Sequence, residues 1–375
     1  MRIVLFCHSL ISDWNHGNAH FLRGIATELQ RRGHTVRAFE PHDGWSLANL
    51  RAEGGDAAVR AFSEAYPGLS PSPVDLARLD LDEALDGADV VLVHEWNDHP
   101  LVARIGRHHA SAAGRHYALL FHDTHHRTVS DPAAMAAYDL QHYDGVLAFG
   151  EVIRERYARQ GWGRRAWTWH EAADTRLFKP QHSAGAPEAD LVWIGNWGDD
   201  ERSAEIREYL VRPVRELELR ARVWGVRYPL AARRVLADAG IEYGGWIANY
   251  RVPGIFARNK VTVHIPRRPY VEALPGIPTI RVFEALACGI ALVSAAWDDT
   301  EALFTPGADF LIARSAREMR AQLAAVLADE ALGRELATHG LDTVRRRHTC
   351  AHRVDELLAI ARQVRSGGSR EVVHV

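Results

Sequence analysis

"GIPTIRVFEALACGIALVS", residues 276–294, joins a helix to a strand of a buried sheet. Thr279 is suited to the N-cap of the helix and Gly289 to its end. The last five residues have the continuous apolar character of a strand that is covered on both faces. Glu284 lies in the middle of this apolar run, about one turn after Arg281. Burying a carboxylate in such a run is costly unless a partner or a ligand binds it.

The same alternation of apolar runs and helical stretches extends along the whole chain. The runs that predict strands are 3–7, 35–39, 89–94, 117–122, 145–150, 191–195, 221–226, 261–265, 290–294 and 310–314. Continuous apolar strands separated by helices are typical of parallel sheets. The Ala-, Pro- and Gly-rich segment 171–190 interrupts the alternation and predicts a linker. The sequence therefore predicts an α/β fold of two Rossmann-like, doubly wound domains, over 1–175 and 186–349, that face a central cleft.

Composition and cysteine usage narrow the class of protein. The 375 residues are too many for one ordinary core. A formal net charge of −3 gives no reason to expect nucleic acid as a partner. Cys7, Cys288 and Cys350 are odd in number and far apart, which favours reduced thiols in a cytoplasmic protein. No stretch approaches the roughly 18 apolar residues of a transmembrane segment.

Two segments of the first half follow predicted strands and carry polar groups. Gly17 and Asn18 lead directly into a helix, where free backbone N–H groups and the positive helix end can meet an anion. "FHDTHHR" places His122, Asp123 and His125 after the fourth strand, and imidazoles beside a carboxylate suit proton transfer. For Gly17 and Asn18, the alternative to an anion site is an ordinary strand–helix connection. For the histidine segment, the alternative to a catalytic role is a solvated loop.

Two segments of the second half have residues that are suited to binding phosphate. In "WIGNWGDDER" a tight turn of Gly195, Asn196 and Trp197 precedes Arg202, and "HIPRRPY" places Arg268 after another strand. Glycine allows close backbone approach to a ligand, and an arginine can hold phosphate with two hydrogen bonds. Exposed arginines without a ligand are the alternative.

The helix that contains Glu284 has two interpretations. One is an ion pair with Arg281 on the surface, which contributes about 0–1 kcal/mol. The other is a nucleotide clamp. In the clamp, Arg281 and the helix N-terminus at Thr279 and Ile280 hold a diphosphate, and Glu284 accepts hydrogen bonds from a ribose diol. The local sequence leaves both open.

No metal is predicted. Asp80 and Asp82 superficially resemble the DxD motif of metal-dependent sugar transferases, but leucines at helical spacing surround them and favour a solvated helix face. Trp14 and Trp96 follow predicted strands of the first domain, where an indole suits stacking on a sugar ring.

Residues 276–311, "GIPTIRVFEALACGIALVSAAWDDTEALFTPGADFL", resemble the donor-binding segment of retaining glycosyltransferases of the large group 1 family. The branch named after the spore maturation protein CgeB is the most similar, and it implies a bacterial protein. Other stretches agree in the same order, namely "HGNAHFLRG", "FHDTHHR", "HEAADTRLFKP", "WIGNWGDDER" and "RHTCAHRVDELL".

The resemblance implies the GT-B fold, with the nucleotide sugar on the second domain, the acceptor on the first, and a C-terminal helix (350–366) that returns to the first domain. It implies transfer of a sugar from a nucleotide diphosphate sugar to an acceptor hydroxyl, with retention and without a bound metal or other cofactor. Glu284 corresponds to the second glutamate of the E-x7-E motif, which holds the ribose. The first glutamate falls at Gly276 and is missing. His122 corresponds to a histidine near the reacting sugar, and His125 is its competitor.

Two alternatives to sugar transfer stay open. A nucleotide-sugar epimerase shares the fold and needs carboxylates, for which Asp98, Asp123 and Glu272 are candidates. A protein that binds nucleotide sugars without turnover is the second alternative, because Gly276 departs from the motif.

Overall fold

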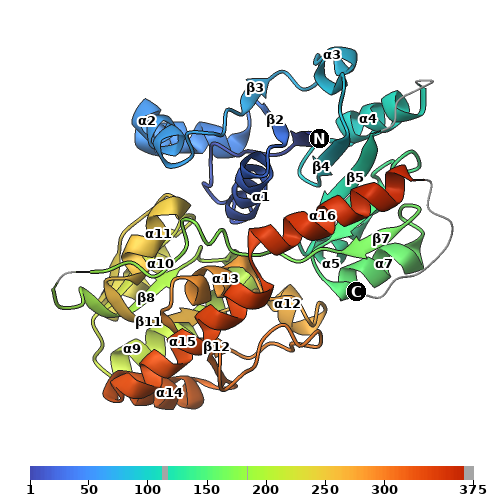
Figure 1. Cartoon of the computed structure of the whole chain (residues 1–375). Coiled ribbons are helices and arrows are strands. Elements are labelled where there is room, and N and C mark those ends of the chain that lie inside the picture. The colour runs from blue at the N-terminus through green and yellow to red at the C-terminus, as the bar shows by residue number, and fades with distance from the viewer. Residues whose placement is uncertain (112–116, 184, 367–375) are drawn as a thin grey trace. The chain divides into compact units, whose positions relative to one another are not determined.

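The computed structural model describes residues 1–111, 117–183 and 185–366 (Figure 1). By its internal contacts the chain divides into two compact units. Unit 1 comprises Met1–Ser12, Leu22–His170 and the segment from Cys350, and unit 2 comprises Asp13–Phe21 and Glu171–Thr349. The segment 13–21 thus belongs to unit 2 although it lies near the N-terminus, which the sequence does not indicate.

Unit 1 is built on a parallel sheet of seven strands in the order β3-β2-β1-β4-β5-β6-β7. Its strands are β1 (Arg2–Phe6), β2 (Thr35–Pro41), β3 (Ser72–Val74), β4 (Val90–His94), β5 (Ala118–Asp123), β6 (Gly145–Ala148) and β7 (Ala166–Thr168). The helices are α1 (Ala19–Arg31), α2 (Trp45–Ala65), α3 (Leu81–Leu85), α4 (His99–Ser111), α5 (Arg127–Ser130), α6 (Pro132–Ala136) and α7 (Glu151–Gln160). The central strands β4, β5 and β6 are buried at every position, as their apolar sequences predict.

The C-terminal helix α16 (Cys350–Arg365) belongs to unit 1 and lies along β5 (Figure 1). Arg32, which follows α1, bonds the carboxylate of Asp355 and the carbonyl of Ala351. The indole of Trp169 donates to the carbonyl of Arg353 at 2.9 Å. The expected return of this helix to the first domain is confirmed.

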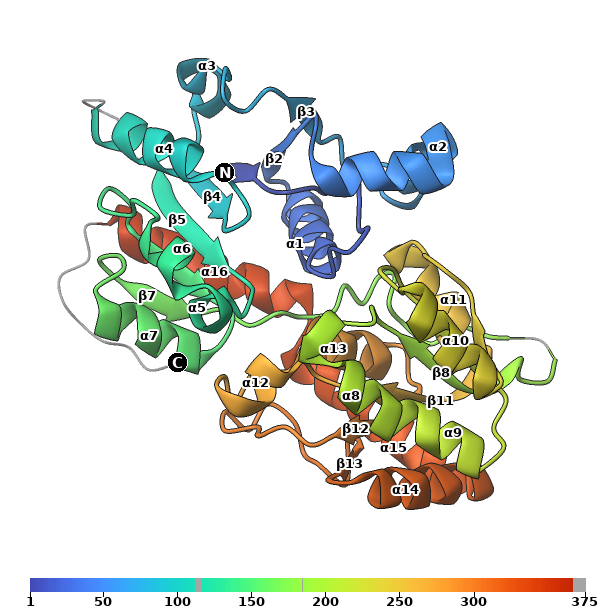
Figure 2. The same cartoon turned by 180° about the vertical axis from the view of Figure 1, so that it is seen from behind.

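Unit 2 contains a second parallel sheet, of six strands in the order β10-β9-β8-β11-β12-β13. Its strands are β8 (Ala189–Ile194), β9 (Ala221–Trp224), β10 (Ile241–Tyr243), β11 (Asn259–His264), β12 (Ala291–Ala295) and β13 (Leu311–Ala313). The helices and short turns are η1 (Asp199–Glu201), α8 (Ser203–Ile206), η2 (Arg207–Val211), α9 (Arg212–Glu216), α10 (Leu230–Asp238), η3 (Asn249–Arg251), α11 (Val252–Phe256), α12 (Arg268–Glu272), α13 (Ile280–Ala287), α14 (Ala316–Ala328) and α15 (Glu330–Arg347). Helices α9 and α14 pack together against this sheet (Figure 2).

The two predicted doubly wound sheets are therefore present, and three strands were not predicted. β3, β7 and β10 have the sequences SPV, AWT and IEY, none of which is a continuous apolar run, unlike LIA of the equally short β13. In the described part of the chain, no helix has the length and apolarity that a membrane crossing requires.

Candidate functional site

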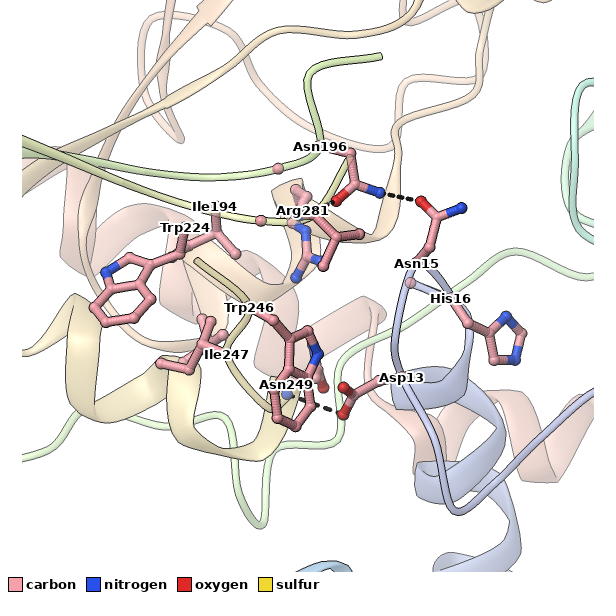
Figure 3. A pocket seen from close by; sticks show the side chains of 15 residues that line it. Asp13, Asn15, His16, Ile194, Asn196, Trp224, Trp246, Ile247, Asn249 and Arg281 are labelled. Carbon is pink, nitrogen blue, oxygen red and sulfur yellow. Dashed lines mark hydrogen bonds between the residues drawn. The ribbon is translucent and has the colours of Figure 1, made fainter. Parts of the chain in front are cut away.

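Unit 2 has a pocket, partly open to solvent, at the carboxyl edge of its sheet (Figure 3). Ligands of open parallel sheets bind at this edge. The lining residues are Asp13, Asn15, His16, Gly17, Ile194, Gly195, Asn196, Trp224, Gly225, Val226, Trp246, Ile247, Asn249, Val252 and Arg281. Of the predicted donor-binding residues, the pocket brings together Gly17, Gly195, Asn196 and Arg281.

Two glycines let the ends of β8 and β9 approach each other at the edge of the pocket. A Cβ atom on Gly225 would lie 2.1 Å from the carbonyl oxygen of Gly195, and Gly225 has a φ of 157°. The same carbonyl accepts a hydrogen bond of 2.8 Å from the hydroxyl of Tyr228. A side chain at position 225 would therefore force the two strand ends apart.

The segment 13–21 supplies one wall of the pocket through side-chain hydrogen bonds. The amide of Asn196 donates to the side-chain oxygen of Asn15, and the backbone N–H of Asn249 donates to a carboxylate oxygen of Asp13 at 3.0 Å (Figure 3). Asp13, Asn15 and Asn249 were not predicted.

Arg281 gives the pocket its cationic group. Its side chain is 29% exposed, and Figure 3 shows the guanidinium among the lining residues. Trp246 and Ile247 add apolar surface from the turn that follows β10. A cation beside an indole and an aliphatic side chain fits a ligand with an anionic part and a flat apolar part.

Glu284 lies behind the pocket lining and is fully buried. Its Oε1 atom accepts from Asn249 Nδ2 at 2.5 Å and is 3.0 Å from His20 Nδ1, and Oε2 pairs with the guanidinium of Arg281. Burial by itself would raise the pKa of Glu284, but the charge of Arg281 and the bonds from His20 and Asn249 hold that pKa below its ordinary value. The predicted ion pair with Arg281 is present, but it is not at the surface, because the carboxylate is inside the protein.

His20 is held as a neutral ring by its two partners. Its Nε2 atom accepts the backbone N–H of Asp174 at 2.8 Å, so the proton is on Nδ1 and is donated to Glu284. The imidazole is fully buried and lies 3.9 Å from the ring of Phe178, centroid to centroid. His20 thus fixes the orientation of the carboxylate.

Glu171 is a second buried carboxyl group, at the N-terminus of α13. It accepts from Asn18 Nδ2 at 2.6 Å and from the backbone N–H of Ile280. Burial, together with the nearby charge of Glu284, raises the pKa of Glu171 to about 8. The predicted phosphate donors Asn18 and Ile280 are therefore bonded to a carboxyl group in the protein without ligand. Sequence reasoning missed Glu171.

Arg202 is held inside unit 2 next to the pocket. Its guanidinium donates to the carbonyl of Ile265 at 3.1 Å and to the carbonyl of Asn196, which lines the pocket. Burial, and secondarily the charge of Arg267, lowers the pKa of Arg202 to about 9. A nearby anion would relieve this destabilisation of the cation.

Three other predicted donor-binding residues lie outside the pocket lining. Trp197 is buried in the core of unit 2, with its ring 5.7 Å from that of Tyr228. Arg268 forms an ion pair with Glu205 at 2.9 Å near the surface. The hydroxyl of Thr279, at the N-cap of α13, bonds His264 at 3.1 Å instead of capping the helix.

The structure explains the glycine at position 276. Gly276 has a φ of 88°, and a Cβ atom there would lie 2.7 Å from Thr300 Oγ1 and 3.0 Å from the side chain of Glu301. A glutamate at this position would be strained and would collide with that segment.

Unit 1 places His122, Asp123 and His125 at the carboxyl end of β5, but only His125 is partly exposed. His122 is 1% exposed and packs edge-on against the ring of Trp169 at 4.8 Å. Burial lowers the pKa of His122 to about 3, so the ring is neutral. Asp123 is also buried and accepts from the hydroxyl of Tyr157 at 2.9 Å. Of these three residues, His125 can therefore contact a ligand directly, whereas His122 and Asp123 are buried.

Asp123 and Glu95 form a buried carboxyl pair. Glu95 accepts from the backbone N–H of Thr124 at 2.7 Å, and its second oxygen is 3.9 Å from Arg127. Burial, and then the proximity of Asp123, raises the pKa of Glu95. Burial raises the pKa of Asp123 to about 6. One proton shared by the pair leaves a single negative charge for Arg127 to balance.

Comparison with known proteins agrees with this architecture. Residues 202–359 match a family of glycosyl transferase-like domains. The whole chain is similar to HepE of Anabaena, solved in complex with UDP-glucose, with a TM-score of 0.68 and 13% identity over 96% of this chain and 100% of that chain. It is also similar to sucrose-phosphate synthase of Thermosynechococcus elongatus, with a TM-score of 0.67 and 14% identity over 98% and 100% of the two chains. A glycosyltransferase of Rickettsia africae gives a TM-score of 0.66 and 10% identity over 97% and 98%.

The fold is GT-B. It has two Rossmann-like parallel sheets and a C-terminal helix that returns to the first of them. No curated protein matches the chain in sequence.

Asp80 and Asp82 lie at the start of α3. Asp80 is the N-cap of α3 and accepts from the backbone N–H groups of Asp82 at 2.9 Å and Glu83 at 3.3 Å. In residues 1–111, 117–183 and 185–366, no three His, Cys, Asp or Glu side chains are placed to hold one metal ion together.

The buried carboxyl pair predicts a pH dependence of stability. Both pKa values are raised in the folded protein, so the pair stabilises the fold at low pH and loses that contribution as the pH rises from about 4 through about 6. Each unit of pKa shift corresponds to about 1.4 kcal/mol. Glu171 and Asp123, whose pKa values are raised mainly by burial, contribute a fall in both proteins. We expect the free energy of unfolding to fall by about 1–3 kcal/mol more between pH 5 and pH 8 in the native protein than in Glu95→Gln.

Urea denaturation at several pH values measures this difference. Asp56→Asn, which changes an exposed carboxylate, is the control and should follow the native protein. Parallel pH profiles of the native protein and Glu95→Gln would contradict a shared proton.

Proposed function

We propose that the protein transfers a sugar from a nucleotide diphosphate sugar to an acceptor hydroxyl, with retention at the anomeric carbon and without a bound metal. The pocket at the carboxyl edge of unit 2 carries this proposal, because it joins the cation of Arg281 to the apolar surface of Trp246. A nucleoside diphosphate has the matching parts, a flat base and a charged diphosphate. The match of residues 202–359 and the UDP-glucose complex of a similar structure support it.

Under this proposal unit 2 is the donor domain and unit 1 the acceptor-side domain. Arg281 holds the diphosphate, and Arg202 adds a second cation. The backbone N–H of Ile280, at the N-terminus of α13, joins them after the carboxyl group of Glu171 has moved away from it. The ribose diol bonds Glu284, whose Oε2 has one protein partner and therefore a free lone pair. Because Glu284 is fully buried, access to Oε2 requires a movement of the surrounding residues.

The transfer needs an exchange of bonds at the anomeric carbon. The bond to the diphosphate oxygen breaks and its electron pair stays on the diphosphate, while the acceptor oxygen bonds the same face of the carbon. The acceptor proton leaves to a base or to the diphosphate oxygen. We propose that His125 contacts the reacting groups, and that His122 and Asp123 position it from beneath: Asp123 accepts the backbone N–H of His125 at 3.2 Å.

The finer assignments follow from the sequence. We place the protein in the CgeB-like branch, and in the cytoplasm because Cys7, Cys288 and Cys350 are buried thiols that form no disulfide. The donor and a hydroxyl acceptor are the expected partners, and nucleic acid is not.

The proposal predicts that a chelator leaves turnover intact. Arginines and a helix end can neutralise the leaving diphosphate without a metal. We expect release of nucleoside diphosphate to change less than about twofold when EDTA replaces Mg²⁺ or Mn²⁺ in the assay. Activity that EDTA abolishes and Mn²⁺ restores would contradict metal independence. The anomeric coupling constant of the product, measured by NMR, tests retention separately.

A further inference from the structure

Trp96 lies at the surface of unit 1 on a loop that hydrogen bonds hold in place. Trp96 follows β4 and is 36% exposed, whereas its neighbours Glu95 and Asn97 are 0% and 5% exposed. Exposing an indole costs hydrophobic stabilisation, and single exposed apolar residues are common. The surroundings of Trp96 distinguish it from such residues.

Hydrogen bonds on both sides of Trp96 fix the loop. The carbonyl of Glu95 accepts from Arg127 at 3.1 Å and from the hydroxyl of Tyr138. The side chain of Asn97 donates to the backbone carbonyl of Phe6 at 2.9 Å. The backbone carbonyl of Asn97 accepts from the hydroxyl of Tyr138 at 3.1 Å. The indole is therefore presented by a preorganised backbone, which lowers the entropy cost of binding a ligand.

Polar groups surround the ring. The guanidinium carbon of Arg127 lies over the indole, 5.0 Å from its centroid, and the imidazole of His125 meets it edge-on at 5.2 Å. Arg127 covers part of the ring, and the exposed part of Trp96 is open to a ligand. An aromatic face bordered by N–H donors is complementary to a sugar ring, which has C–H groups on its faces and hydroxyls on its rim.

From this geometry we propose that Trp96 is the stacking platform for the acceptor and that the acceptor is a saccharide. The inference rests on the proposed sugar transfer and specifies its second substrate. His125, the partly exposed histidine at the end of β5, would then lie beside the bound sugar. A lipid acceptor is disfavoured, because in the described residues of unit 1 the large hydrophobic side chains classed as exposed are Trp45 and Trp96 alone. These two residues do not form an apolar track for an acyl chain.

Saturation-transfer NMR on the full chain with saturating UDP tests the proposal. The probes are methyl pyranosides of glucose, galactose, mannose, rhamnose, fucose and N-acetylglucosamine, with maltotriose, cellotriose and chitotriose, and octanol as the alkyl probe. We expect at least one saccharide to bind the native protein. Its affinity should fall at least about 10-fold in Trp96→Ala and in Trp96→Leu, since aromatic anchors dominate binding sites of this kind.

Trp45→Ala is the matched control. Trp45 is 41% exposed, also lies in unit 1, and has its ring 4.6 Å from that of His8. This variant should bind the saccharide like the native protein. A melting curve for each variant shows that it is folded, and Trp96→Leu keeps apolar contact if Trp96→Ala is unstable.

Four outcomes would overturn the proposal: no saccharide binds, octanol alone binds, Trp96→Ala and Trp96→Leu bind as the native protein does, or Trp45→Ala loses as much affinity. UDP binding in the same samples reports on the donor site. Intact UDP binding with failed saccharide binding would therefore refute the acceptor inference and leave the proposed function standing.

Discussion

Replacing Glu284 with alanine is expected to lower the free energy of unfolding by about 3–5 kcal/mol, because a buried ion pair loses one partner. The carboxylate accepts from His20 and Asn249 and pairs with Arg281. His20 and Asn249 are 0% and 4% exposed, so water cannot replace the lost acceptor at either group.

Urea denaturation of the native protein and the variant at pH 7 measures this effect. Glu205→Ala is the control, because Glu205 also pairs with an arginine in unit 2 but its side chain is 27% exposed. The control should lose at most about 1 kcal/mol. Equal losses in the two variants would show that Glu284 does not hold this part of unit 2 together.

His125→Ala is expected to lower turnover about 10²- to 10⁴-fold, the range that general acid–base contacts contribute. Donor affinity should change little, because His125 belongs to unit 1 and the donor pocket to unit 2. Initial rates give turnover, and calorimetric titration with UDP gives the affinity.

His122→Ala is the matched comparison. His122 is 1% exposed and packs against Trp169, so its removal creates a cavity and should cost on the order of 2–4 kcal/mol of stability. Folded His122→Ala should retain more turnover than His125→Ala. If His122→Ala were inactive and His125→Ala nearly as active as the native protein, His122 and not His125 would contact the reacting groups.

The architecture could be predicted because buried parallel strands are continuous apolar runs. The long strands β4, β5, β8 and β11 were predicted within a few residues. β10 was not, since Ile241–Tyr243 has a glutamate at its centre and shows no continuous apolar run. Missing this strand hid the turn that follows it, which supplies Trp246 and Asn249 to the pocket.

The site was predictable where one residue type is suited to a ligand, as with Arg281. It was not predictable where a role depends on contacts across the sequence. From the sequence, Glu284 was expected to accept hydrogen bonds from a ribose. In the folded protein it is already bonded to His20, which lies 264 positions earlier. The one available signal was the position of His20 at the start of the helix that the glycine loop leads into.

Gly276 shows the same limit. From the sequence it is only a missing carboxylate, whereas the structure gives the reason, a φ of 88° and a close contact with Thr300. This contact joins residues that are distant in sequence. The structure therefore explains why glycine stands at this position.

The fate of the sugar in a panel of UDP-, GDP-, ADP- and dTDP-sugars tests the central claim most directly. Each is incubated with the protein in EDTA, with and without the saccharides named above, and all products are separated and identified by mass spectrometry and NMR. The account predicts that one donor yields nucleoside diphosphate and a glycosylated acceptor, and that His125→Ala forms both slowly. A nucleotide sugar that is recovered intact, or recovered with only its sugar epimerised, would contradict sugar transfer.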